Sequence, residues 1–198
     1  MHDYNVARSM CLSPIMSALH SNGINLGEAS FLSGIEKQRI LDIGMGVGTE
    51  TSIEEAARLA SLVGIELSVV PEDAAVNAFT EITVHRVSRA DMTGYARRVV
   101  AMTDKVADFC IDLRLATQLP AGVFERRFGV EQGFMARLAD CSRAASTNLL
   151  EMYTYLGSFG ATMASFPAKS RYANYYRALM ATEKELANGP IATVLKVA

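Results

Sequence analysis

Apolar residues recur at helical spacing near the start of the chain. Over residues 4–21 they lie mostly three or four positions apart, which predicts a helix that Pro14 interrupts. The stretch Ser21-Asn22-Gly23 ends that segment, and residues 27–36 predict a second short helix. The chain therefore begins with helical structure.

The pattern changes between residues 39 and 73. Arg39–Ile43 is an apolar run of strand length that stops at a glycine-rich turn over residues 44–48. Residues 53–63 carry an apolar helical stripe with Thr51 or Ser52 as its cap, and residues 65–70 alternate like a second strand. This order of strand, turn, helix and strand predicts a parallel βαβ unit.

Later segments extend the prediction. Residues 82–87 alternate and are β-branched, which predicts a third strand, and residues 92–104 predict a helix. Phe109–Leu113 is either a fourth strand or part of one helix over residues 103–119. Further elements are expected as helices over 123–139, 141–157 and 171–187 and as a terminal strand over 191–197, with breaks at Gly157, Gly160 and Pro167.

These elements predict an α/β fold with a Rossmann-like three-layer core and a largely helical C-terminal part. We expect a single domain over residues 1–198, with a helical lead-in over 1–38, the core over 39–120 and a helical part over 121–198. The pattern shows no internal repeat and no low-complexity linker.

Composition narrows the class of protein. Half of the 198 residues are hydrophobic, which excludes disorder over the whole chain. The formal net charge of −2 gives no general electrostatic reason to bind nucleic acid, although a small basic patch is compatible with it. The sequence has neither an apolar stretch of membrane-spanning length nor the order of a secretory signal, so we expect a cytoplasmic protein with no membrane contact.

Cysteine and histidine offer little chemistry. Cys11, Cys110 and Cys141 lie far apart and have no metal-ligand spacing, so we expect small buried hydrophobes, with no disulfide framework and no metal site. The three histidines are isolated from one another and from a partner at useful spacing. No catalytic residue can be named on this basis.

The glycine-rich turn is the segment with the clearest chemical meaning. A glycine turn between a strand and a helix exposes backbone N–H groups and lets a ligand approach closely. The dinucleotide pattern GxGxxG is not reproduced, because Thr49 or Thr51 stands at the sixth position, and the Gly-Lys-Ser/Thr of a Walker A loop is absent.

Residues 40–49, which read ILDIGMGVGT, resemble motif I of the class I S-adenosylmethionine-dependent methyltransferases. The resemblance is clearest over residues 39–73 and weaker up to residue 113. It implies S-adenosylmethionine as cofactor. Gly44, Gly46 and Gly48 would line it, and Asp42 would orient the turn.

The same resemblance suggests two further cofactor contacts. Glu72 would bind the ribose hydroxyls, with Asp73 and Glu66 as rivals, and Asp91 would contact the adenine amine. The sequence departs from the family after residue 120, where no fifth strand with a preceding Gly-Gly turn is visible. Each residue also has a structural interpretation: the glycines as a tight turn, Asp42 as a cap, Glu72 as a solvated acid, and Asp91 as the N-cap of the next helix.

Two functions follow. The first is methyl transfer from S-adenosylmethionine to an unknown small-molecule or protein acceptor held by the helical second half. The alternative is a non-catalytic, mainly helical adaptor or assembly subunit that acts through protein–protein contacts, with a partner protein or a second copy on the C-terminal helices. Tyrosines gathered in the last third of the chain favour the alternative, because tyrosine often anchors interfaces: Tyr153, Tyr155, Tyr172, Tyr175 and Tyr176.

Overall fold

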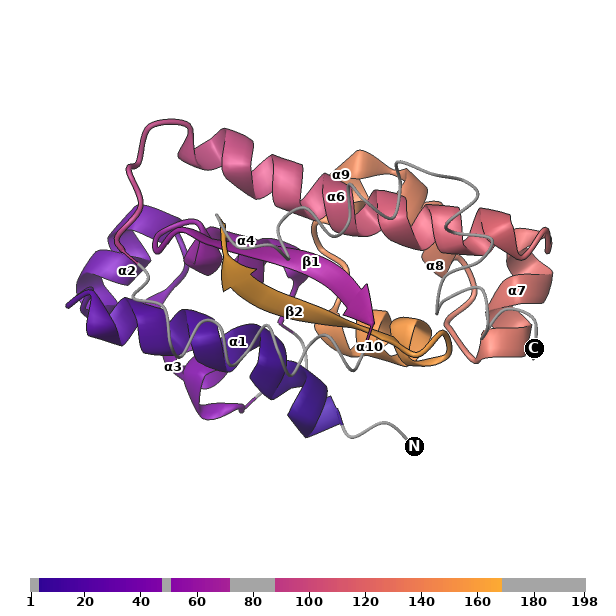
Figure 1. The fold of residues 1–198 in the computed structure, drawn as a ribbon, viewed down its shortest axis with the longest axis horizontal. Coiled ribbons are helices and arrows are strands. Elements are labelled where there is room, and N and C mark those ends of the chain that lie inside the picture. Colours follow the sequence, from indigo (N-terminus) through magenta and orange to yellow (C-terminus); the bar gives the residue numbers. More distant parts are fainter. Residues whose placement is uncertain (1–3, 48–50, 72–87, 169–198) are drawn as a thin grey trace.

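A computed structural model describes residues 4–47, 51–71 and 88–168 (Figure 1). Its elements follow one another as α1 (Tyr4–Ser21), α2 (Leu26–Ser33), α3 (Lys37–Met45), α4 (Ile53–Ala60), β1 (Ile65–Pro71), α6 (Tyr95–Ala116), α7 (Ala121–Phe128), α8 (Phe134–Ala139), α9 (Cys141–Ala144), α10 (Leu149–Gly157) and β2 (Ala161–Pro167). The fold mixes helices with a small sheet, so the coarse prediction of helix and strand together is confirmed.

Several local predictions are confirmed. The first helix runs from Tyr4 to Ser21, but the predicted interruption at Pro14 is wrong, because Pro14 lies inside one continuous helix. Strand β1 follows Gly64, which has φ +64°. Ser52 caps α4 through a capping box. The Ser52 hydroxyl accepts a hydrogen bond from the Glu55 amide, and the Glu55 carboxylate accepts one from the Ser52 amide.

The predicted strand over residues 39–43 is wrong, because these residues lie within helix α3. Ile40 and Ile43 are three positions apart and buried, whereas Leu41 between them is 41% exposed, which is helical periodicity in a short apolar run. Gly46 ends the helix with φ 76°, and its N–H donates to the Asp42 carbonyl oxygen.

The sheet also differs from the prediction. β1 pairs with β2 in antiparallel register, with Ser68 opposite Ala164. Among the described residues these strands form a two-stranded sheet, so neither a parallel βαβ unit nor a Rossmann three-layer core is present there.

Other segments fall differently as well. Phe109–Leu113 belongs to helix α6, which decides between the two alternatives, while the helices expected over 123–139 and 141–157 are each divided. β2 occupies residues that the pattern marks only as breaks. The elements expected over 82–87, 171–187 and 191–197 lie outside the described residues.

An approximate two-fold axis relates the two parts of the chain. Ser52 bridges Asn148 and Ser68 faces Ala164, and both pairs are 96 positions apart (148 − 52 and 164 − 68). The hydrogen bonds around the first pair are symmetric too: the Ile53 amide donates to residue 147 and the Leu149 amide to residue 51, at 3.0 and 2.9 Å. The expectation of no internal repeat is therefore wrong.

We call residues 4–71 the first unit and residues 95–167 the second unit. The order α1, α2, α3, α4, β1 of the first matches α6, α7, α8, α10, β2 of the second, and α9 is an addition. Short sequence matches accompany the elements: Gly34-Ile35-Glu36 with Gly129-Val130-Glu131, Gly64 with Gly160, and Pro71 with Pro167. The division into lead-in, core and helical part at residues 38 and 120 does not follow these units.

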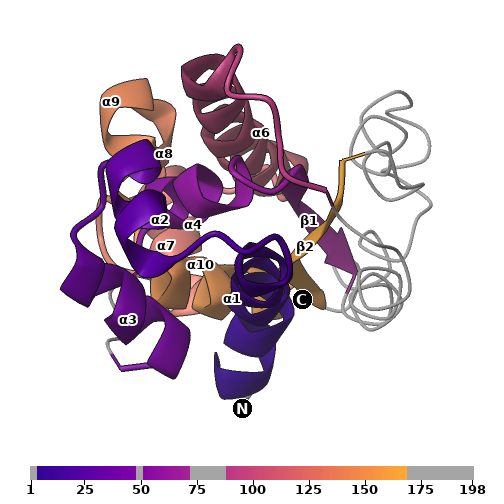
Figure 2. The same cartoon turned by 90° about the vertical axis from the view of Figure 1, so that its left-hand side faces the viewer.

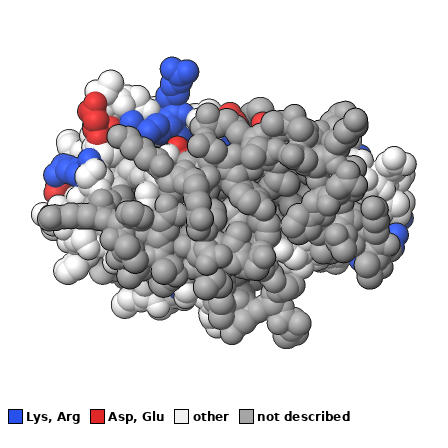
Figure 3. Space-filling model, viewed as in Figure 1, with Lys and Arg blue, Asp and Glu red and all other residues white. Residues whose placement is uncertain are grey.

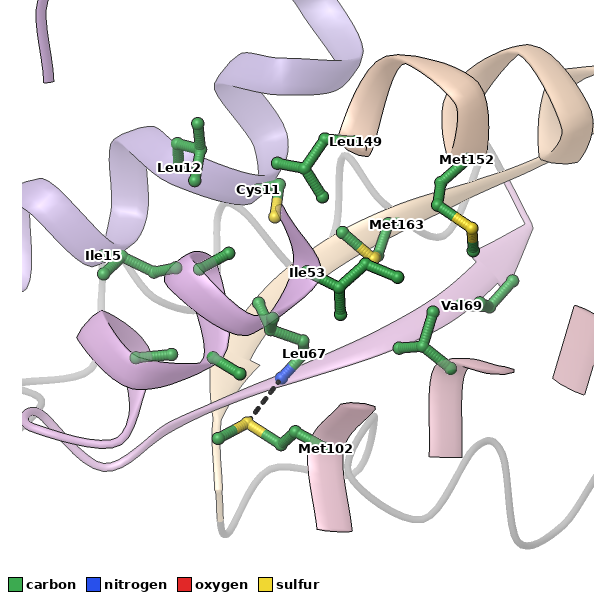
Figure 4. Packing of buried hydrophobic residues seen from close by; sticks show 14 of the residues in the cluster. Cys11, Leu12, Ile15, Ile53, Leu67, Val69, Met102, Leu149, Met152 and Met163 are labelled. Atoms are coloured by element: carbon green, nitrogen blue, oxygen red, sulfur yellow. Dashed lines mark hydrogen bonds between the residues drawn. The ribbon is translucent and has the colours of Figure 1, made fainter. Parts of the chain in front are cut away.

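The two units interlock. Helix α1 of the first unit packs on strand β2 of the second, and α6 of the second packs on β1 of the first. The Ser165 hydroxyl donates to the Cys11 carbonyl oxygen at 2.6 Å, and the Leu67 amide donates to Met102 Sδ at 3.4 Å. Figure 4 shows side chains of both units in one apolar cluster, which includes the fully buried Cys11.

Candidate functional site

The residues predicted for a methyltransferase cofactor have structural partners in the protein. The Asp42 carboxylate accepts a hydrogen bond from Gln38 Nε2 at 2.9 Å, one helical turn earlier on α3. The Asp42 carbonyl oxygen accepts from the amides of Gly46 and Val47, which closes the end of the helix. Asp42 thus stabilises α3 itself.

The structure describes two of the three motif glycines, and neither faces an open ligand site. Gly44 lies inside α3, where an added Cβ would come within 3.0 Å of Met16 Cε on α1. At Gly46 the left-handed backbone excludes other residues at low cost, and a Cβ would lie 2.6 Å from Arg8 Nη1. Gly48 lies outside the described residues.

The N-terminus of α4 does not offer the free amides that a glycine turn would present. The amides of Ile53 and Glu54 donate to carbonyl oxygens of residues 147 and 145 in the second unit, each at 3.0 Å. The Glu55 amide donates to Ser52 Oγ, and the Ser52 amide to Glu55 Oε2. The second unit and the capping box therefore occupy the donors that anion binding at a helix N-terminus requires.

Asp91 and the ribose candidates lie elsewhere. The Asp91 carboxylate accepts from the Thr93 amide at 3.0 Å in the turn before α6, and this hydrogen bond lowers the pKa of Asp91. Glu66 pairs with Lys105 at 3.6 Å, while Glu72 and Asp73 lie outside the described residues. Figure 1 shows α3, the helix that contains Asp42, apart from the start of α6, the helix that follows Asp91.

Each unit contains a helix-turn-helix pair. In the first unit α2 and α3 are joined by residues 34–36, and Gly34 has φ 70° with its N–H donating to the Ser30 carbonyl oxygen. In the second, residues 129–133 join α7 and α8, and Gly129 has φ 67° with its N–H donating to the Glu125 carbonyl oxygen. Two helices joined by a short glycine-containing turn occur in ordinary helical hairpins and in the helix-turn-helix motif, whose second helix enters the DNA major groove.

The two pairs lie on one face of the molecule. Figure 1 places α2 and α3 towards one end of the long axis and α7 and α8 towards the other. In the perpendicular view of Figure 2, these four helices are on the side away from the strands. The two-fold axis therefore runs between two helix pairs that face the same way.

An ion pair fixes the second helix of each pair. Arg39 on α3 donates to both oxygens of Glu55 on α4, at 2.6 and 2.8 Å. In the second unit Arg137 on α8 donates to Glu151 on α10 at 2.5 Å, and Glu151 occupies the position of Glu55. Burial raises the pKa of Glu55, but the hydrogen bonds from Arg39 and Ser52 outweigh it, so its pKa is below the usual range.

The exposed residues of the two pairs differ in kind. On the first pair they include Phe31, Lys37, Gln38, Leu41 and Met45. On the second pair they are mostly polar or small, with Val123 as an apolar residue that is 41% exposed: Val123, Arg126, Arg127, Glu131, Gln132 and Ala136. These residues, rather than the predicted cofactor set, form the candidate contact surface.

The N-termini of the second helices differ too. The Glu125 carboxylate, on α7 and only 4% exposed, accepts from the amides of Gly133 and Met135 at the start of α8, both at 3.0 Å. Glu36 at the start of α3 makes no side-chain cap. The amides at the start of α8 therefore donate to a buried carboxylate, whereas Glu36 at the start of α3 is exposed and accepts no capping hydrogen bond.

Surface charge is mixed. On the face seen in Figure 1, which is opposite to the two helix pairs, the described Lys and Arg side chains lie at the margins, with Asp and Glu beside those at the upper left (Figure 3). Among the described residues there is no group of three or more His, Cys, Asp and Glu that fits a metal, and no helix that is long and apolar enough to cross a membrane.

No protein-family model matches the chain, and neither a curated protein nor a solved structure shows significant similarity to it. The sequence pattern does not predict the helix-turn-helix pairs, because the apolar run of α3 has the length and composition of a strand. The signal that identifies the pairs is a repeated tripeptide, Gly-Ile-Glu after α2 and Gly-Val-Glu after α7. In each unit a later glycine precedes a strand that ends in proline.

Proposed function

We propose that this protein binds double-stranded DNA through its two helix-turn-helix pairs. The observation that supports the proposal is their arrangement, with both pairs on one face, towards opposite ends of the molecule and related by an approximate two-fold axis. Two-fold helix-turn-helix dimers meet two half-sites one helical turn apart. Here a single chain supplies both halves.

Electrostatics sets the expected strength of this binding. The exposed cations on the two pairs are few, with Lys37 on α3 and Arg126 and Arg127 on α7, and the acidic Glu36 and Glu131 lie near the turns. Affinity gained from phosphates rises with the number of cations that contact them. We therefore expect weak non-specific binding, in line with the net charge of −2, and a large share of the affinity from contacts to base edges.

This proposal keeps part of the adaptor prediction and replaces its partner. The protein acts by binding, without chemistry of its own, and its ligand is a duplex rather than another protein. Methyl transfer stays a prediction. Calorimetric titration with S-adenosylhomocysteine tests it, because a micromolar dissociation constant would establish a cofactor site and no detectable heat from the folded protein would argue against one.

Fluorescence anisotropy with a labelled mixed-sequence duplex of about 30 base pairs tests the proposal, since two half-sites one turn apart need that span. At low salt we expect a dissociation constant in or below the range of about 10⁻⁴–10⁻⁶ M typical of non-specific binding. Lys37→Ala should weaken it, while Lys105→Ala, on α6 and away from both pairs, should not. A folded protein that leaves the anisotropy unchanged at low salt would contradict the proposal.

A further inference from the structure

The second helices of the two units present different side chains at equivalent positions. On α3 the residues Gln38, Leu41 and Met45 follow a spacing of three and four, so they share one face of the helix. Leu41 is 41% and Met45 66% exposed. The equivalent positions of the second unit hold Gly133, Ala136 and Asp140, two of which have no side chain long enough to reach into a groove.

The α3 set matches the chemistry of A·T base pairs. A glutamine amide makes two hydrogen bonds with adenine in the major groove, and apolar side chains contact the thymine methyl group. Gln38 Nε2 is already held by Asp42 at 2.9 Å, which orients the amide and leaves its oxygen and second N–H available to a base.

The charged residues are also placed differently on the two helix pairs. Lys37, an exposed cation, stands at the start of α3 itself, next to the exposed N-cap residue Glu36, which makes no side-chain capping hydrogen bond. At the start of α8 the buried Glu125 takes the helix amides, and Glu131 pairs with Arg137 at 2.9 Å. The exposed cations of the second pair, Arg126 and Arg127, belong to its first helix, the one that crosses the phosphate backbone in such complexes.

We infer that the two units divide the work on DNA: the first unit reads an A·T-containing half-site through Gln38, Leu41 and Met45, and the second unit binds the neighbouring half-site through phosphates without reading its bases. This inference rests on the proposed function. It also explains why apolar side chains are exposed on α3, since thymine methyl groups would cover them. Both units therefore contact the duplex, but the first unit alone selects its sequence.

The experiment is selection of duplexes from a randomised pool by the full-length protein, followed by replacement of each thymine in the recovered site by uracil. Uracil lacks only the C5 methyl group, so it removes the apolar contact and keeps base pairing. We expect one half-site with an A·T-containing sequence requirement and one without. Uracil at the preferred position should weaken binding, and the variant L41A/M45A should lose that sensitivity.

The expected size is a loss of roughly 5- to 150-fold in discrimination at the adenine for Gln38→Ala, from the worth of one bidentate base contact. The matched control is R126A/R127A, which should weaken binding to all sequences alike and keep the preference for the recovered half-site. All five side chains are at the surface, and circular dichroism of each variant verifies the fold.

The other outcomes overturn the inference in different ways. Two half-sites of equal specificity, or binding with no sequence preference, would refute the division of work and leave the proposed function in place. A folded protein that retains no duplex at low salt would overturn both. In that case sedimentation velocity on wild type and L41A/M45A would show whether the apolar residues of α3 mediate self-association instead.

Discussion

The second unit packs a group of aromatic rings at positions where the first unit has no aromatic side chain. The ring centroid of Tyr155 on α10 lies 5.5 Å from that of Phe124 on α7 and 5.4 Å from that of Phe134 on α8, and Phe128 and Phe159 extend the group. The equivalent residues of the first unit are Ala29, Ser33, Arg39, Leu59 and Val63. The two units therefore share the same order of elements but have different side chains at these equivalent positions.

The exposed residues of the two helix pairs differ as well. The first unit exposes Phe31, 87% accessible, together with Leu41 and Met45, and the second unit has Arg126, Ala136 and Asp140 at those positions. The unit without this aromatic group therefore exposes apolar side chains at three positions where the other unit has polar or small residues. We therefore expect the second unit to supply the larger share of stability, while the second helix of the first unit is left available for contact.

The largest expected effect on stability comes from Phe124→Ala, in the aromatic group of the second unit. Phe124 is fully buried and touches the rings of Phe128, Tyr155 and Phe159. Its truncation should lower the free energy of unfolding by about 3–5 kcal/mol. Because the units interlock, they should unfold together. Urea denaturation, monitored by circular dichroism and by tyrosine fluorescence, should therefore show a single transition. Phe31→Ala, at an exposed position on α2, the helix equivalent to α7, should change stability by no more than about 0.5 kcal/mol.

Glu125→Ala should have the next largest effect. The buried carboxylate accepts from two amides at the start of α8, and its removal leaves both without that acceptor. Hydrogen bonds to a charged group are worth about 1.5–3 kcal/mol, so a destabilisation of this order is expected in chemical denaturation. Ser30→Ala at the equivalent position of the first unit is the control and should cost about 0.5 kcal/mol or less. Equal destabilisation in the two variants would contradict the difference between the two turns.

Glu55→Gln tests the ion pair that fixes α3. The pKa of Glu55 is lower in the folded protein than in the unfolded chain, so the unfolded state binds more protons as pH falls. Its stabilisation is therefore complete above the ordinary carboxyl pKa and is lost as pH drops through the lowered folded value. We expect Glu55→Gln to cost about 1–2 kcal/mol at pH 7 and the difference from wild type to shrink below about pH 4. Glu54→Gln, whose partner Arg58 is more exposed, should show little change.

The smallest effect concerns the phosphate contacts of the second unit. R126A/R127A should make the dependence of log affinity on log salt less steep, by roughly 0.9 for each phosphate that the variant no longer neutralises. Anisotropy titrations at several salt concentrations measure this slope. The variant K105A provides the control on a cation outside both pairs. If R126A/R127A leaves the slope of log affinity against log salt unchanged, α7 does not contact phosphates.

Local signals in the sequence are enough for part of this fold. Ser52 with Glu55 predicts the start of α4, and Gly64 before alternating residues predicts β1, because caps and turns depend on neighbouring residues. Ile40-Leu41 is misleading because a run this short does not separate strand from helix. β2 is not predicted because its residues resemble breaks and pair with a strand almost a hundred positions earlier.

The candidate site is beyond the sequence pattern for a related reason. Asp42, Gly44 and Gly46 match a cofactor motif in their spacing, but the motif requires a preceding strand, and here the residues lie on and at the end of a helix. The glycines are instead explained by Met16 and by a left-handed cap. The feature that carries the proposed function is the relation between two units, which is visible only when the chain is compared with itself.

Hydroxyl-radical footprinting of the selected duplex shows whether the two helix-turn-helix pairs act together on DNA. We predict two protected patches on one face of the DNA, centred about one helical turn apart, from a single bound chain. The patch with the A·T sequence requirement should fade first in the variant L41A/M45A. A duplex that shows one continuous patch, or no protection at saturating protein, would contradict joint binding by the two pairs.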